Sequence, residues 1–317
     1  MGKERRFLSE VEIFGKTFKV KNYTCSVNGC PYEKKLREEK FYLSVCPTSY
    51  CDARCPFCSV SGTGRRDRLD LNKLEKVLTE LKNKKLVKGI SITGGEPFSD
   101  VVLLNEITEL VFAMFGTEFE IAIHTNGSGL AELDKIKSLD YIDAVHISRH
   151  HYDDGRNAAY FKTKVPTAEE LTAAVKACYD PKLFVYNCLL LKDGIGTSEE
   201  MIKMLEFAAE TGVPKVGFIT PMAVNEYAKK QSVSYTEVFP KNNDRILYTA
   251  SLCDYDFCHC RDGAYAATKG KLVEFYGRET CYGTKEYVRG LVYGADNVLR
   301  TGFGVDAEKI HGFIDEE

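Results

Sequence analysis

The chain has 317 residues, of which 44% are hydrophobic and 28% charged. This composition is typical of a globular protein with one large or two modest domains, and it excludes disordered and collagen-like chains. With 43 basic and 46 acidic side chains, the formal charge is -3, so an extended nucleic acid is not an expected partner. No apolar run is long enough to span a bilayer, and residues 1–10 lack the apolar core of a signal peptide, which predicts a cytoplasmic protein without a membrane partner.

The first region, residues 1–39, is expected to be a small N-terminal β addition. Residues 11–14 and 17–20 alternate in the manner of strands on either side of Gly15 and Lys16. A glycine at that point is typical of a hairpin turn, so we predict that the two runs pair.

Residues 40–221 alternate between strand-like and helix-like patterns. Strands are expected over 41–45, 89–93, 120–124, 142–148, 183–191 and 216–220. Leucines at 71, 74, 78 and 81 and the run 101–115 have helical spacing. Thr167 with Glu170, and Thr197 with Glu200, match the capping box that begins a helix. Six βα units predict a parallel sheet, either open or rolled into a partial barrel, with ligands at the carboxyl ends of its strands.

After residue 221 the alternation stops, and residues 222–317 are expected to form a third region rich in Tyr, Gly and Cys. Residues 264–268 and 271–276 are expected to pair as a hairpin.

Twelve cysteines are many for a protein of a reducing compartment, where they point to metal ligation or redox chemistry. Cys51, Cys55 and Cys58 directly follow the first strand of the alternating region. Thiolates with this spacing can bind three irons of a [4Fe-4S] cube and leave the fourth iron open. A zinc site completed by Cys46 is the alternative, because structural zinc usually takes four ligands.

Two further motifs end the second and third strands. Residues 93–97 read Thr-Gly-Gly-Glu-Pro, in which glycines allow the backbone to approach a ligand and the carboxylate can receive an ammonium group. Residues 124–127 read His-Thr-Asn-Gly. Each motif alone would also fit an ordinary tight turn.

Together, in this order and spacing, the motifs of residues 40–221 resemble the radical S-adenosylmethionine superfamily. The resemblance implies an α/β fold, a partial (β/α)6 TIM-type barrel, with the cluster held by Cys51, Cys55 and Cys58. It also implies S-adenosylmethionine as cofactor, with its adenine near Phe57. Its amino group would be held by the turn of Gly94, Gly95, Glu96 and Pro97.

Within the superfamily, the chain is similar to the branch that contains the GTP cyclase of molybdenum-cofactor biosynthesis and the twitch and SPASM enzymes. That likeness implies that Thr125, Asn126 and Ser148 lie near the ribose and methionine, and Asn187 near the adenosyl group. It also implies a second iron–sulfur cluster on Cys258 and Cys260 with Cys253 or Cys281. A structural zinc or unligated thiols are the alternatives there.

Arg149, His150 and His151 follow the fourth strand and are the candidates for substrate contacts. The planar guanidinium of Arg149 could pair with the methionine carboxylate. A solvated loop with hydrogen-bonded histidines is the alternative.

The resemblance implies an enzyme that cleaves S-adenosylmethionine reductively, with electrons from a flavodoxin or ferredoxin type of donor. The 5′-deoxyadenosyl radical so formed abstracts hydrogen from a substrate. We expect a peptide substrate, because the tail cysteines depart from the cyclase pattern. The alternatives are a nucleotide-like metabolite or, in a different class, a zinc-stabilised binding protein without catalysis.

Overall fold

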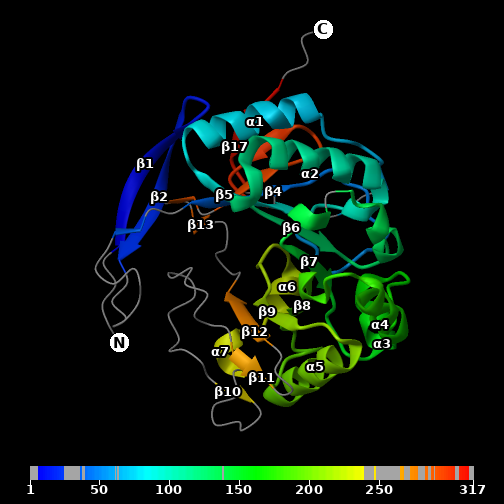
Figure 1. Cartoon of the computed structure of the whole chain (residues 1–317). Helices are drawn as coiled ribbons and strands as arrows, with labels where there is room; N and C mark the ends of the chain where they lie inside the picture. The colour runs from blue at the N-terminus through cyan, green and yellow to red at the C-terminus, as the bar shows by residue number, and fades with distance from the viewer. Residues whose placement is uncertain are drawn as a thin grey trace.

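The computed structural model describes residues 6–24, 36–37, 40–60, 62, 64–137, 139–238, 246–247, 265–267, 272–277, 283–284, 287–288, 290–303 and 307–313. Its helices form an arc around one side of a curved sheet (Figure 1). The strands are β1 (Arg6–Ile13), β2 (Lys16–Thr24), β3 (Leu36–Arg37), β4 (Phe41–Val45), β5 (Val87–Ile92), β6 (Glu120–Thr125), β7 (Ala144–Ser148), β8 (Phe184–Leu189), β9 (Lys215–Thr220), β10 (Ile246–Leu247), β11 (Tyr265–Ala267), β12 (Leu272–Gly277), β13 (Gly283–Thr284), β14 (Tyr287–Val288), β15 (Leu291–Tyr293), β16 (Val298–Arg300) and β17 (Lys309–Gly312). The α-helices are α1 (Leu71–Asn83), α2 (Val101–Phe115), α3 (Asp154–Phe161), α4 (Ala168–Ala177), α5 (Ser198–Thr211), α6 (Glu226–Gln231) and α7 (Tyr235–Val238).

Strands β4 to β9 lie side by side in sequence order, and each pairs with the next in parallel. This is the parallel sheet that the alternating pattern predicts, and it has the α/β architecture of a partial barrel. The tail adds a parallel strand at each edge, since β12 pairs with β9 and β15 pairs with β4. Residues far apart in sequence therefore extend the sheet at both of its edges.

The core lies between the sheet and the helices. Alternate strand residues, among them Leu43, Ile90 and Ile123, are fully buried in one cluster with Leu74 and Leu78 of α1. Helix α1 has the predicted leucine spacing, and it begins after Asp70, whose side chain accepts bonds from two amides of the first turn. Burial of these side chains contributes most of the stabilisation of the sheet.

Of the two predicted capping boxes, the first is complete and the second has only its N-cap half. Thr167 and Glu170 form the reciprocal capping box at the start of α4. Thr197 accepts a bond from the Glu200 amide at the start of α5. The Glu200 carboxylate instead bonds Lys203 at 3.0 Å.

The connection from β6 to β7 differs from the predicted βα pattern. It consists of two 3-10 segments, η3 (Leu130–Lys135) and η4 (Leu139–Tyr141), in place of an α-helix. Its buried apolar residues, Leu130, Leu133 and Ile136, recur every three positions. Three residues per turn is the 3-10 period, so this spacing places all three on one face of a tighter helix.

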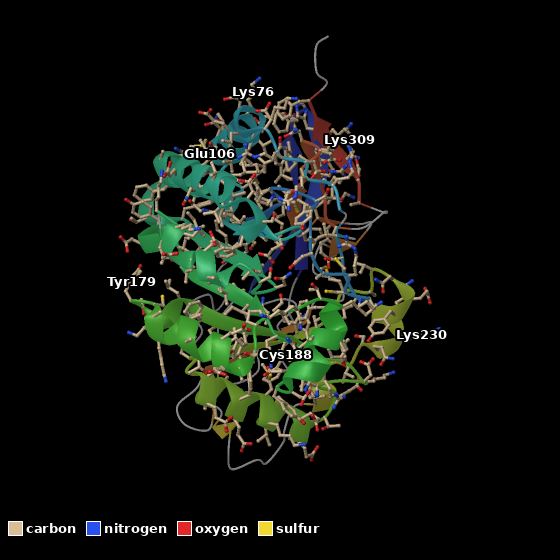
Figure 2. All side chains as sticks on the ribbon, turned by 90° about the vertical axis from the view of Figure 1, so that its right-hand side faces the viewer. Lys76, Glu106, Tyr179, Cys188, Lys230 and Lys309 are labelled. Carbon is tan, nitrogen blue, oxygen red and sulfur yellow. The ribbon has the colours of Figure 1, made fainter. Side chains whose placement is uncertain are left out.

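At the N-terminus, β1 and β2 form the predicted antiparallel hairpin, and Gly15 in its turn has a φ of +73°. In the tail, β11 and β12 pair antiparallel as predicted, while residues 268–271 between them lie outside the described residues. Among the described residues, no helix combines the length and the apolar character needed to cross a membrane. Cys188 of β8 is fully buried in the core, whereas Lys76, Glu106, Lys230 and Lys309 lie at the periphery (Figure 2).

Candidate functional site

The cysteine loop leaves the carboxyl end of β4 and is held at both ends. The Cys46 amide donates to Tyr293 O of β15 (2.9 Å), and the Arg54 amide donates to Phe161 O at the end of α3 (2.8 Å). Cys51, Cys55 and Cys58 are free and half-buried, whereas Cys46 is buried. The three thiols of the predicted cluster motif are therefore accessible, and the fourth is enclosed by protein.

Burial governs the protonation of Cys46, Cys51 and Cys55. It raises the pKa of Cys51 to about 11 and that of Cys55 to about 12, with the neighbouring thiols adding to the shift. Cys46 is raised to about 12, again mainly by burial. Such thiols are protonated at neutral pH, and a bound metal must displace their protons.

The donor set fits an iron–sulfur cube better than a zinc ion. Among the described residues, no three His, Cys, Asp or Glu side chains converge on a position for one metal ion. The zinc alternative with Cys46 requires such convergence, whereas the thiols of a cube bind separate irons. A cluster would be held by Cys51, Cys55 and Cys58.

The glycines of the second motif bring it against the cysteine loop. A Cβ on Gly94, which has a φ of +106°, would lie 2.6 Å from Cys46 Cβ. A Cβ on Gly95 would lie 1.9 Å from Tyr50 O. The Gly95 amide donates to Thr48 O (3.0 Å) and the Glu96 amide to Tyr50 O (2.7 Å). The missing side chains thus allow a direct backbone seam between the motifs.

The Glu96 carboxylate connects the ends of β5 and β6. One oxygen accepts from the Phe98 amide (3.1 Å) and Thr125 Oγ1 (2.7 Å), and the other accepts from the Asn126 amide (2.8 Å). Glu96 is 3% exposed, and its burial raises its pKa to about 7 despite these three bonds. The carboxyl group therefore changes charge near neutral pH.

Asn126 connects the end of β6 back to the cysteine loop, so that the cysteine loop, Glu96 and Asn126 form a closed circuit of hydrogen bonds. Its Nδ2 donates to Asp52 Oδ1 at 2.7 Å. Asp52 lies between Cys51 and Cys55 and was not predicted as a site residue; its position inside the cysteine motif is the only sequence signal for it. Phe57 lies at this end of the barrel, edge-on to His150 with 4.9 Å between ring centroids. Pro97 is buried at the start of the short helix η1 (Pro97–Asp100).

Ser148 and Asn187 are register partners at the ends of β7 and β8. The Asn187 amide contacts two histidines, with Oδ1 3.1 Å from His146 Nδ1 and Nδ2 3.2 Å from His124 Nδ1. His124 belongs to the motif of residues 124–127 and His146 to the predicted strand 142–148, but neither was predicted as a site residue. The predicted contact of Asn187 with the adenosyl group stays a prediction.

Arg149 is 1% exposed and is bound by its own loop. Its guanidinium donates to His151 O (2.8 Å), Pro166 O (2.9 Å) and Tyr152 O (3.1 Å) and pairs with Asp154 at 2.5 Å. This arrangement favours an anchoring role within the loop, and the loop is buried, unlike the solvated loop of the alternative interpretation. Binding of the methionine carboxylate by Arg149 stays a prediction.

The two histidines after Arg149 are also buried. His150 Nδ1 accepts from the Leu189 amide (3.2 Å), and burial lowers its pKa to about 3, so it is neutral. His151 Nδ1 accepts from the Asp153 amide (2.9 Å). Its Nε2 lies 4.0 Å from Glu200 Oε2, the carboxylate oxygen that does not bond Lys203. Neither His151 Nε2 nor Glu200 Oε2 has a hydrogen-bond partner within the described part of the chain.

The cysteines predicted for a second cluster, Cys253, Cys258, Cys260 and Cys281, lie outside the described residues.

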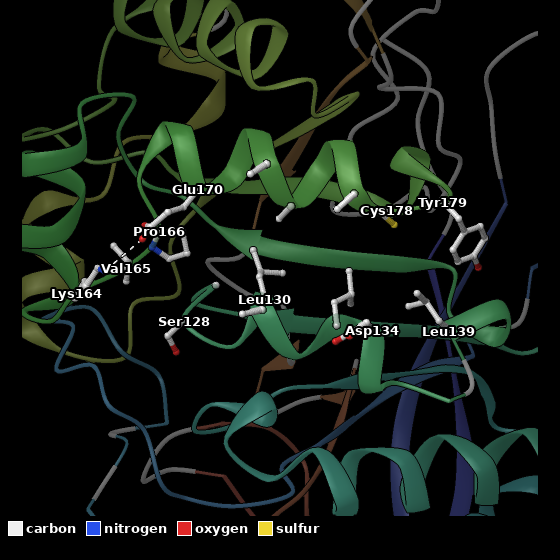
Figure 3. Close-up of a pocket in the computed structure, with 16 residues that line it drawn as sticks. Ser128, Leu130, Asp134, Leu139, Lys164, Val165, Pro166, Glu170, Cys178 and Tyr179 are labelled. Atoms are coloured by element: carbon white, nitrogen blue, oxygen red, sulfur yellow. Dashed lines mark ion pairs between the residues drawn. The ribbon is translucent and has the colours of Figure 1, made fainter.

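A separate hollow of about 760 Å³ lies between α4 and the two 3-10 segments (Figure 3). Leu130 and Leu139 face it from one side and Val165 and Cys178 from the other, and Lys164 pairs with Glu170 at its rim. The hollow begins at Gly127, next to Asn126, but its walls are mainly apolar. It does not contain the cysteine loop.

The comparisons with known proteins agree with this geometry. A family model described as the Radical SAM superfamily matches residues 45–208, just over half of the chain. A search of curated proteins finds no match.

Among solved structures, one similar fold is Streptococcus suis SuiB bound to S-adenosylmethionine, with a TM-score of 0.54 and 17% identity; the match covers 86% of this chain and 63% of SuiB. SuiB bound to its precursor peptide SuiA matches with a TM-score of 0.52 and 15% identity over 83% of this chain and 60% of SuiB. The chain therefore spans less than two thirds of the SuiB length, and the likeness is one of fold. The family match over residues 45–208 establishes that this chain belongs to the radical SAM superfamily, whose members use a [4Fe-4S] cluster and S-adenosylmethionine.

Proposed function

We propose that this chain is a radical SAM enzyme that abstracts hydrogen from a peptide. Cys51, Cys55 and Cys58 would hold the cluster. When bound and reduced, the cluster supplies the electron that splits S-adenosylmethionine into methionine and a 5′-deoxyadenosyl radical. The chain's own residues position the reactants and exclude water from them.

One observation carries the proposal. Backbone bonds tie Gly95 and Glu96 to the cysteine loop, the Glu96 carboxylate ties β5 to β6, and Asn126 returns to Asp52. This closed circuit fixes the thiols relative to the strand ends before any ligand binds. Such preorganisation is what orientation of a cofactor requires.

Within the circuit, Glu96 is the proposed partner of the methionine amino group. A carboxylate can accept about four hydrogen bonds, and three donors reach Glu96. One acceptor position therefore remains for an ammonium group. Phe57, Thr125 and Ser148 are proposed contacts of the adenosyl and methionine groups. Thr125 and Ser148 end β6 and β7, and Phe57 lies edge-on to His150 just after β7.

The peptide assignment is supported by the fold likeness to SuiB, which was crystallised with a precursor peptide. We further propose a flavodoxin or ferredoxin type of electron donor. A reducing cytoplasm is the proposed location, because the six cysteines in the described part of the chain are all free thiols.

Anaerobic reconstitution tests the cofactor assignment. Purified protein should bind iron and labile sulfide and, with S-adenosylmethionine and dithionite, release 5′-deoxyadenosine. Cys55→Ala should abolish release, because a thiol ligand is lost, while Cys178→Ala, a half-buried cysteine at the end of α4, should retain it. Full release by Cys55→Ala would contradict the proposal.

Two further measurements separate the remaining assignments. We propose that Cys258 and Cys260, with Cys253 or Cys281, bind a second cluster. Iron analysis of the reconstituted protein should then give about eight irons per chain, whereas about four irons per chain would contradict a second cluster. For the substrate, perdeuterated short peptides should transfer deuterium into 5′-deoxyadenosine. Transfer from perdeuterated nucleosides alone would instead favour the nucleotide-like metabolite.

A further inference from the structure

A small group of apolar residues, separate from the main core, packs against the cysteine loop. Its members include Ala53 and Phe57 of the loop, Tyr160 and Phe161 of α3, and Ala228 of α6. Cys51 and Cys55, two of the proposed cluster ligands, are half-buried against this group. We call it the apolar wall, because it forms one side of the proposed iron–sulfur site.

Phe57 lies at the centre of the apolar wall, with aromatic rings from three segments around it. His150 meets it edge-on, and the ring centroids of Tyr160 and Tyr227 lie 5.9 and 6.3 Å from that of Phe57. These separations are within the range in which aromatic rings attract one another. Tyr160 belongs to α3 and Tyr227 to α6, so the surroundings of Phe57 depend on how two helices are held.

Asp193, in the loop after β8, holds the two tyrosines together. The Tyr160 hydroxyl donates to its Oδ1 at 3.0 Å, and the Tyr227 hydroxyl donates to its Oδ2 at 2.7 Å. Its backbone oxygen accepts from Arg156 of α3 at 2.8 Å. A Cβ on Gly194 would lie 2.4 Å from the Tyr160 hydroxyl oxygen, so the absence of a side chain there leaves room for this contact.

Both helices also bond the cysteine loop directly. The Arg54 amide donates to Phe161 O at the end of α3, and Asn225, the N-cap of α6, donates from Nδ2 to Pro56 O at 3.1 Å. Together with Asp193, these bonds form an outer circuit that runs from the loop through α3 and α6 and back. The outer circuit shares no residue with the circuit through Glu96.

The burial of these residues increases from Asp193 inward. Asp193 is exposed, Tyr227 is half-buried, and Tyr160 and Phe57 are buried. Separation of the two tyrosines would therefore expose Phe57 and the thiols behind it to water. The apolar residues around a metal centre control its access to solvent, and radical chemistry requires that water and competing donors are kept out.

We infer that Asp193 is a positioning residue that closes the apolar wall of the cluster site against water. It acts through the hydroxyls of Tyr160 and Tyr227, whose rings cover Phe57. The inference deepens the proposed function and rests on it for the identity of the metal group.

Iron release tests the closure in the anaerobically reconstituted full-length protein. With a ferrous chelator in excess, Asp193→Ala should lose iron about tenfold faster than the wild type, because both tyrosine bonds are gone. Tyr227→Phe loses one bond, and about threefold is expected. Asp193→Asn should stay close to the wild-type rate, since an amide can accept from one hydroxyl and donate to the other.

Tyr179→Phe is the matched control. Tyr179 is exposed and donates to Asp140 Oδ1 at 2.8 Å, so the change removes the same kind of bond outside the apolar wall. Its iron release should equal that of the wild type. Deuterium modulation in the electron spin echo of the reduced cluster in D2O should deepen in Asp193→Ala alone of these two variants, which a general loss of stability would not produce.

The inference is overturned if Asp193→Ala releases iron at the wild-type rate, or if Asp193→Asn releases it as fast as Asp193→Ala. An equal acceleration by Tyr179→Phe, or unchanged deuterium modulation in Asp193→Ala, would also overturn it.

A wild type that binds no iron would refute the proposed function, and alkylation of the apoprotein would then decide the inference. Measured against Cys178 in the same sample, Cys55 of Asp193→Ala should react with iodoacetamide about tenfold faster than Cys55 of the wild type. Equal rates would overturn the inference.

Discussion

Gly95→Ala is the sharpest test of the seam between the two motifs. The added Cβ would lie 1.9 Å from Tyr50 O and 2.5 Å from its carbonyl carbon. Both contacts involve backbone, so relief requires the cysteine loop and the end of β5 to separate by about 1 Å. Two backbone hydrogen bonds cross this seam, from Gly95 to Thr48 and from Glu96 to Tyr50.

The magnitude follows from these contacts. Overpacking typically costs about 1–3 kcal/mol, and each lost backbone bond costs about 0.5–1.5 kcal/mol. We expect Gly95→Ala to lower the free energy of unfolding by about 2–6 kcal/mol, a large part of the total for a typical domain. Because the thiols move with the seam, iron retention should fall as well.

Anaerobic urea unfolding and iron analysis measure the two effects. Gly155→Ala in α3 is the matched control, since its new Cβ would meet no atom closer than 3.4 Å. In a helix that exchange should stabilise by about 0.4–1 kcal/mol. A Gly95→Ala protein with wild-type unfolding and full iron content would refute the reasoning.

Two further predictions concern charge. Because burial raises the pKa of Glu96 to about 7, the carboxylate becomes protonated as the pH falls through 7. Binding of S-adenosylmethionine, measured by calorimetry, should then weaken by up to about tenfold per pH unit below 7. Glu96→Gln should bind more weakly and without this pH dependence, and a wild-type affinity that does not change with pH would contradict the assignment. Arg149→Met should lower the free energy of unfolding by about 3–5 kcal/mol in urea titration, because it leaves three carbonyl oxygens without their donor. Arg300→Met, at a partly exposed ion pair, should cost about 1 kcal/mol or less, and equal effects of the two changes would count against the anchoring role.

Local patterns predicted the regular part of the fold. The run 101–115 is helical over the predicted bounds, and each predicted strand from 41–45 to 216–220 is present. The exception is the connection after β6, where apolar residues recur every three positions rather than every three or four. This spacing indicates a 3-10 helix, but the alternation of strands and helices along the chain favoured an α-helix at this position.

The site was predictable where it depends on motifs and unpredictable where it depends on register. The thiols and the Gly-Gly-Glu turn are contiguous in sequence. In contrast, Arg149 bonds Pro166, 17 residues away, and the stacking of His124 on His146 depends on how β6 aligns with β7. No local pattern fixes those distances.

Strands β12 and β15, which the tail adds at the two edges of the parallel sheet, have a consequence for synthesis on the ribosome. Strands β4 and β9 acquire them only from residues 291–293 and 272–277. A nascent chain that has emerged only to residue 238 therefore exposes two unsatisfied strand edges, which attract other chains. Fragments ending there should aggregate during expression, and trigger-type holdases that shield nascent strands should raise the yield of the whole chain.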